Sequence, residues 1–148
     1  MTKNQEEGLN HLQVIKTLTD KIKSQKMEIE ALKYQAQGDG AIRYDKERVQ
    51  TSPQNYMEIA MAAALDIEYE IEEEEAQLDS LKCDAYSYIK RIKDEDERTF
   101  IINYYINDLH INELIPIMHR SERALYYLRE SALEHYGEEL LKVCSPIQ

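Results

Sequence analysis

The sequence is poor in the patterns from which catalytic and cofactor sites are built. Four glycines are scattered through 148 residues, so no glycine-rich loop is present to hold a phosphate. The two cysteines, Cys83 and Cys144, stand alone and lack the close spacing of a metal or redox pair. We therefore expect two reduced thiols in a cytoplasm rather than a metal or redox site.

The histidines and acidic residues also lack a reactive arrangement. No two of the four histidines are separated by four residues, and the HExxH pattern is absent. The glutamate run at residues 72–75 lacks the mixed oxygen ligands and the turn glycine of a calcium loop. We therefore expect no metal, no cofactor and no enzymatic activity.

Long apolar segments are absent as well. No run of about 20 apolar residues occurs, so no segment is expected to span a membrane. The first seven residues contain no apolar stretch of the kind that secretory signals carry. These absences predict a protein that acts in the cytoplasm, away from the membrane.

Basic residues are outnumbered. The chain has 29 acidic and 18 basic residues and a formal net charge of −11, which disfavours nonspecific binding of nucleic acid over the whole surface. Residues 54–93 carry ten acids and four bases, and residues 94–148 carry eleven and five. Between Arg98 and Tyr136 the counts are five and four, so this stretch is nearly neutral.

Two long stretches have the apolar periodicity of helices. The first runs from Leu9 to Leu32, and its heptad contains one polar residue, Gln25. A loop at about residues 36–53 follows. The second stretch starts at Ser52-Pro53, where serine suits the cap and proline the first helical position. No proline or glycine interrupts residues 54–93, which predicts one helix of about 60 Å.

The first helix is rich in lysine and the second in glutamate, which predicts an antiparallel pair, within one chain or exchanged between two. The two apolar seams exceed what one small head could cover, so we expect a homodimer or a higher oligomer. A helix of a monomeric bundle is the alternative. The residues expected to mediate oligomerisation are Ile15, Leu18, Ile22, Ala60, Ala64, Ile67, Ile71 and Leu78.

Residues 94–136 predict three shorter helices. Phe100, Ile101, Tyr104 and Tyr105 recur at helical spacing and give the first of them one buried face. Asn107-Asp108 breaks this pattern with two residues that tolerate turns. The second helix is expected at residues 113–118.

A tight corner at His119-Arg120 leads into the third helix. Ser121 can cap this helix, and Glu122 places an acid in its first turn. Its apolar stripe is Leu125, Leu128 and Ala132, and Gly137 is expected to end it. Two helices joined by such a corner, with a third packed behind, form a helix-turn-helix.

The residues Glu113-Leu114-Ile115, Met118 and Ser121-Glu122-Arg123-Ala124-Leu125-Tyr126 resemble the helix-turn-helix of region 4 in sigma-70-family factors. The segment at residues 96–105 is similar to the helix that precedes it in such domains. Two departures stand out. His119 lies where that family prefers glycine and is expected to adopt a left-handed conformation. Pro116 falls in the expected first turn of the second helix, where proline costs little.

The layout of the chain resembles small phage proteins related to the ArpU/RinA-type regulators of late transcription. The resemblance implies an all-α protein with a helical hairpin or coiled coil over residues 1–93 and a DNA-binding head over residues 94–148. It implies sequence-specific binding of double-stranded DNA in the cytoplasm of a bacterial host cell, activation of late genes and contact with RNA polymerase.

Three residues of the third helix, Arg123, Tyr126 and Tyr127, point away from the apolar stripe and are candidates for contacts with base edges. Arg120 and Arg129 are candidates for phosphate contacts, and Ser121 offers its hydroxyl or backbone N–H.

Two other functions stay open. The head could be a scaffold for a protein-interaction module, with the glutamates at 68, 70 and 72–75 docking a basic host protein; a solvated surface is the simpler interpretation of these glutamates. A small-terminase-like DNA-packaging adaptor would also combine a head with an oligomerising helix, although the head comes last here.

Overall fold

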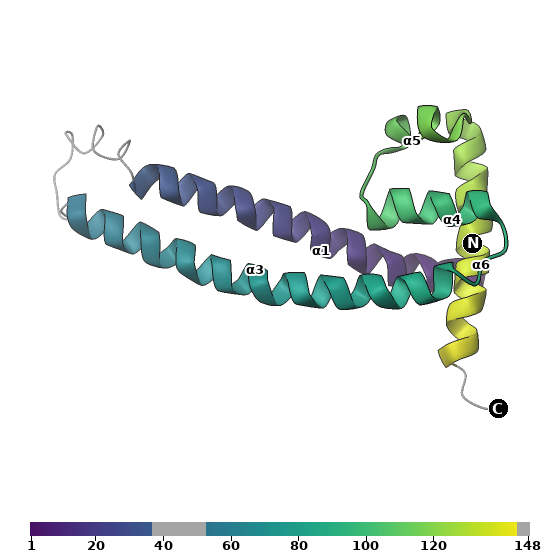
Figure 1. The fold of residues 1–148 in the computed structure, drawn as a ribbon, viewed down its shortest axis with the longest axis horizontal. Coiled ribbons are helices and arrows are strands. Elements are labelled where there is room, and N and C mark those ends of the chain that lie inside the picture. The colour runs from purple at the N-terminus through teal and green to yellow at the C-terminus, as the bar shows by residue number, and fades with distance from the viewer. Residues whose placement is uncertain (37–52, 145–148) are drawn as a thin grey trace. The chain divides into compact units, whose positions relative to one another are not determined.

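The computed structural model describes residues 1–36 and 53–144, and these residues are entirely helical apart from short connections. The helices are α1 (Lys3–Tyr34), α3 (Pro53–Ile89), α4 (Glu95–Ile101), α5 (Ile111–Met118) and α6 (Glu122–Cys144), and a π-helical turn, η2 (Ile102–Ile106), extends α4. The two long helices pack antiparallel, and the shorter helices follow them (Figure 1). The predicted all-α fold is therefore confirmed.

The long helices lie close to their predicted positions. α1 begins six residues before the predicted start at Leu9, and Pro53 is the first residue of α3, as the sequence predicts. The expected cap Ser52 and most of the expected loop at residues 36–53 lie outside the described residues. Within the described ranges, no helix is long and apolar enough to cross a membrane.

The chain divides into two compact units. Residues 20–77 form the hairpin unit, and residues 1–19 together with 78–148 form the head unit. The predicted boundary after residue 93 follows the end of α3, whereas the head unit takes in the first turns of α1 and the last turns of α3.

Ion pairs join α1 to α3 throughout the hairpin unit. The Nζ–Oε2 distances are 2.6 Å for Lys21–Glu74, 3.0 Å for Lys26–Glu75 and 3.1 Å for Lys33–Glu68. The side-chain amide of Gln25 donates a 3.0 Å hydrogen bond to Glu70. The predicted complementarity of charge between the two helices is therefore present within one chain.

Most of the expected oligomerisation residues are buried. Ile15, Ile22, Ala60, Ala64, Ile71 and Leu78 are at most 8% exposed, and Leu18 and Ile67 are half-buried. Because α1 and α3 pack against each other, these side chains serve the packing of a single chain. An interface with a second copy would also need residues outside this set.

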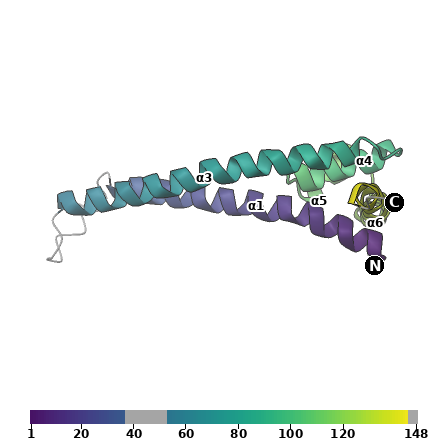
Figure 2. The ribbon, with the colours of Figure 1, turned by 90° about the horizontal axis from the view of Figure 1, so that it is seen from below.

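The head unit is built around α6. This helix lies between α4 on one side and the first turns of α1 on the other (Figure 2). The ring centroids of Phe100 and Tyr104 are 5.2 Å apart in a stacked pair, and Tyr105 meets Tyr104 edge-on at 4.9 Å. Phe100, Ile101 and Tyr105 are buried, as the sequence predicts, and Tyr104 is half-buried.

Two glycines allow α1 to cross α6 at close range. A Cβ on Gly137 would overlap the backbone carbonyl of Asn4, and a Cβ on Gly8 would lie 2.9 Å from the carbonyl oxygen of Leu133. The prediction that Gly137 ends the last helix is wrong, since α6 continues to Cys144. This helical position holds a glycine because the crossing of α1 and α6 leaves no room for a side chain.

The turn after η2 is also fixed by α1. Asp108 has a positive φ of 59°, which agrees with the predicted break at Asn107-Asp108. The Nζ of Lys16 lies 2.9 Å from the Asp108 carboxylate, donates to the Tyr104 carbonyl at 3.2 Å and lies 4.4 Å from the centre of the Tyr104 ring. Lys16 thereby holds the chain as it leaves the first helix of the head.

Candidate nucleic-acid interface

The helix before the corner, α5, begins two residues earlier than predicted. His110 is its N-cap, and the backbone N–H of His110 donates a 2.8 Å hydrogen bond to the Glu113 carboxylate. Pro116 is therefore the sixth residue of α5, not a residue of its first turn. The prediction that this proline lies in the first turn is wrong, and a proline in a helix interior removes one backbone hydrogen bond.

The corner has the predicted geometry. His119 is left-handed, with φ 56° and ψ 44°, and its N–H donates to the carbonyl of Ile115. The hydroxyl of Ser121 accepts a 3.1 Å hydrogen bond from the backbone N–H of Ala124, so Ser121 caps α6. α5 and α6 are in contact across this corner (Figure 1).

We expect His119→Gly to stabilise the protein by up to about 1 kcal/mol. Glycine has no Cβ and adopts the left-handed conformation without the penalty that histidine carries. His119→Ala is the matched control, since it removes the imidazole and keeps the Cβ, and it should give no gain. Denaturant unfolding of the three chains measures the difference. A marked loss of stability in both variants would show that the imidazole makes a necessary contact.

α6 has one buried and one exposed face over its first half. Leu125, Ala132 and Leu133 are buried, and Leu128 is half-buried, so the predicted stripe faces inward. The exposed face carries one basic, two aromatic and two acidic residues: Glu122, Arg123, Tyr126, Tyr127 and Glu130.

Arg123 and Tyr127 form a pair one turn apart on this face. The guanidinium carbon lies 5.8 Å from the centre of the Tyr127 ring, and an Arg123 nitrogen lies 3.5 Å from the Tyr127 hydroxyl. Tyr126 is 43% exposed and Tyr127 is 60% exposed. The three residues expected to contact bases therefore share one accessible surface, with the guanidinium held beside an aromatic ring.

The two expected phosphate contacts are both engaged within the chain. Arg120 forms an exposed ion pair with Asp96 of α4. The Nε of Arg129 donates a 3.2 Å hydrogen bond to the Tyr105 hydroxyl, and burial raises the pKa of Tyr105, which keeps this hydroxyl protonated. Arg129 is half-buried, so it is not a freely exposed cation. It joins α6 to η2.

A buried carboxylate that sequence reasoning missed ties α4 to α6. Glu97 is only 3% exposed, accepts a hydrogen bond from the hydroxyl of Ser131 and lies 2.6 Å from Nδ1 of His135. This hydrogen bond to Glu97 raises the pKa of His135. Because Glu97 and its partners are more than 30 residues apart in the sequence, no local pattern joins them.

The raised pKa of His135 predicts a loss of stability at alkaline pH. Below the unfolded pKa of 6.5, both states carry the proton and the contribution is fully present. As pH rises through the folded pKa, the contribution is lost. His135 is half-exposed, so solvent screening limits the effect to less than about 1 kcal/mol. Thermal unfolding at a series of pH values should therefore show a decline above pH 6.5.

His135→Gln provides the control, because it should flatten the decline above pH 6.5. Burial lowers the pKa of His11, a half-buried histidine whose Nδ1 lies 2.9 Å from the Tyr136 hydroxyl. The contribution of His11 changes below pH 6.5 and does not overlap with that of His135. Identical profiles for the original chain and the variant would contradict the proposed link between Glu97 and His135.

Comparison of the chain with protein-family models, curated proteins and solved structures finds no match. The description of residues 111–144 as a helix-turn-helix thus depends on their own geometry: a short helix, a left-handed corner and a long helix capped by Ser121.

Proposed function

We propose that the chain is a DNA-binding transcription regulator whose α6 helix enters the major groove. The observation that carries the proposal is the corner at residues 119–121, which presents the exposed Arg123–Tyr127 pair in the first turns of α6. The first turns of a recognition helix are where side chains meet base edges in helix-turn-helix proteins. A guanidinium at that position suits a guanine edge.

The supporting contacts follow from the same surface. Arg123 reads a base edge, with Tyr126 and Tyr127 beside it. Arg120 gives up its exposed pair with Asp96 to contact a phosphate, since such surface pairs contribute little. The resemblance to phage regulators adds late-gene activation and contact with RNA polymerase to this proposal.

The acidic surface of the exposed face limits affinity. Glu122 and Glu130 flank the expected contacts, and Arg129 is held by Tyr105. Arg120 and Ser121 remain as phosphate contacts, so the log–log slope of affinity against salt should be shallow, about −1 to −2. Fluorescence anisotropy with a duplex selected from a random-sequence library, over a salt series, tests this. Absence of any enriched duplex would refute the proposal.

A protein-docking role for the same surface is the second candidate. The observation that favours it is the exposure of Tyr126 and Tyr127, since aromatic residues are enriched at protein interfaces. Docking through the acidic face of α3 has less support. Glu68, Glu70, Glu74 and Glu75 contact α1 within the chain.

A further inference from the structure

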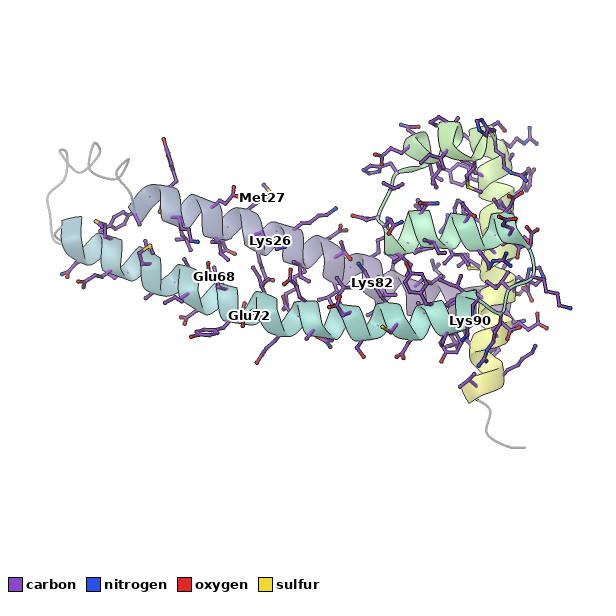
Figure 3. All side chains as sticks on the ribbon, viewed as in Figure 1. Lys26, Met27, Glu68, Glu72, Lys82 and Lys90 are labelled. Atoms are coloured by element: carbon purple, nitrogen blue, oxygen red, sulfur yellow. The ribbon has the colours of Figure 1, made fainter. Side chains whose placement is uncertain are left out.

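An open groove of about 570 Å³ lies between α1 and α3 in the hairpin unit. Ile29 and Ile71 form its apolar floor. Two lysines, Lys26 and Lys33, line the α1 side, and two glutamates, Glu68 and Glu72, line the α3 side (Figure 3). Glu30 is the one acid on the α1 side. The groove therefore has a largely basic bank and an acidic bank above an apolar floor.

An exposed apolar stripe lies next to the acidic bank, on the same side of α3. Met57, Met61, Leu65, Glu68 and Glu72 follow one another at spacings of four, four, three and four residues, so they share one side of the helix. Met57, Met61 and Leu65 are 47%, 44% and 51% exposed. The buried Ala60 and Ala64 and the half-buried Ile67 already cover the side of α3 that faces α1. A contiguous apolar patch outside the packed face is typical of an interaction surface.

We propose that this groove and stripe, together called the groove flank, bind a second copy of the chain. The arrangement of charge identifies the occupant. The pairs Lys26–Glu75 and Lys33–Glu68 place Ile29 at the level of Ile71. A two-fold axis along the hairpin then sets α1 of one copy against α3 of the other, with neighbouring helices antiparallel as in a four-helix bundle.

In this arrangement the basic bank of each copy faces the acidic bank of the other. Lys26 and Lys33, which pair with Glu75 and Glu68 of their own copy, then also lie beside Glu72 and Glu68 of the second copy. The two apolar floors and stripes cover each other. The pairing is self-complementary, as a two-fold interface requires. The segment at residues 37–52 is a poorer occupant, because six of its sixteen residues are charged.

Dimerisation is measured on the full chain by analytical ultracentrifugation without DNA, so its failure is independent of the proposed DNA binding. Leu65→Glu puts a charge into the apolar stripe and should weaken the dimer by about tenfold or more. Ile59→Glu is the matched control. It adds the same charge at an exposed site of α3 on the opposite flank and should leave the dissociation constant unchanged.

A second pair of variants tests the charge arrangement directly. Glu30→Lys completes the basic bank and should strengthen the dimer, whereas Glu28→Lys makes the same charge change on the opposite flank and should do so far less. Circular dichroism confirms that each variant keeps its helix content. If Leu65→Glu unfolds, the comparison of Glu30→Lys with Glu28→Lys decides whether the dimer interface lies at the groove.

The proposal is overturned by a chain that stays monomeric up to about 100 μM, where even weak specific dimers are populated. Equal effects of Leu65→Glu and Ile59→Glu on the dissociation constant of the dimer would also overturn it, as would equal effects of Glu30→Lys and Glu28→Lys. In either case the interface would not lie on the groove flank.

Discussion

Gly137→Ala is expected to destabilise the head unit by up to about 2 kcal/mol, although alanine is the better helix former. A Cβ at this position overlaps the backbone carbonyl of Asn4. A backbone group cannot move aside as the end of a flexible side chain can. Overpacking against fixed backbone costs about 1–3 kcal/mol, and here it must also offset a gain of about 1 kcal/mol in helix propensity. Denaturant unfolding, followed by the circular dichroism of the helices, measures the change.

A truncation separates the clash from other effects of the alanine. In a chain that lacks residues 1–7, Asn4 is absent and the same substitution should become stabilising, by up to about 1 kcal/mol. The truncation also removes the hydrogen bonds from Thr2 and Asn4 to Glu134, so each variant is compared with its own parent. If alanine destabilises both parents equally, the helix crossing is not the cause.

Arg123→Ala should weaken binding to a selected duplex by about 1–3 kcal/mol, a factor of about 5 to 150 in Kd. Arg123 is exposed and contacts only Tyr127 among the residues with described interactions, so thermal stability should barely change. The preference should relax at one base pair, because a lost base contact affects the position it reads. Anisotropy titrations against single-base variants of the duplex measure both effects.

Lys142→Ala is the matched control for this substitution. It lies on the same helix, removes the same charge and breaks only a surface pair with Glu139. Arg129→Ala is unsuitable as a simple phosphate probe, because loss of its hydrogen bond to Tyr105 should also lower stability. If Arg123→Ala binds the duplex as tightly as Lys142→Ala does, Arg123 does not contact DNA.

Acidic-face docking needs its own test, because the glutamates of α3 are not equivalent. Replacing Glu74 or Glu75 removes ion pairs to Lys21 and Lys26, so a loss of function could reflect a weakened hairpin. Glu73 is exposed, does not line the groove of the hairpin unit and is the appropriate target.

Features that repeat along the chain could be predicted from the sequence. The heptads and the opposite charges of residues 16–33 and 68–75 specify two long antiparallel helices, and the ion pairs bear this out. The corner was also predictable. Ser121 has the side chain of a helix cap, and the resemblance to sigma-70 region 4 leads one to expect a left-handed residue at His119.

Features that depend on distant contacts could not be predicted. A glycine near the end of a helix pattern usually reads as a stop, and only the approach of α1 explains why Gly137 lies inside α6. Arg129 looks like a free cation until η2 brings the Tyr105 hydroxyl beside it. Burial of Glu97 likewise depends on the packing of α4 against α6, which sequence spacing does not reveal.

The most direct test of the proposed function is amide hydrogen exchange of the full chain with and without a selected duplex. We predict that DNA slows exchange at residues 119–130, which include the corner and the first turns of α6, and leaves residues 68–75 of α3 unchanged. Unchanged exchange at residues 119–130 in a chain saturated with duplex would contradict DNA recognition by this helix-turn-helix.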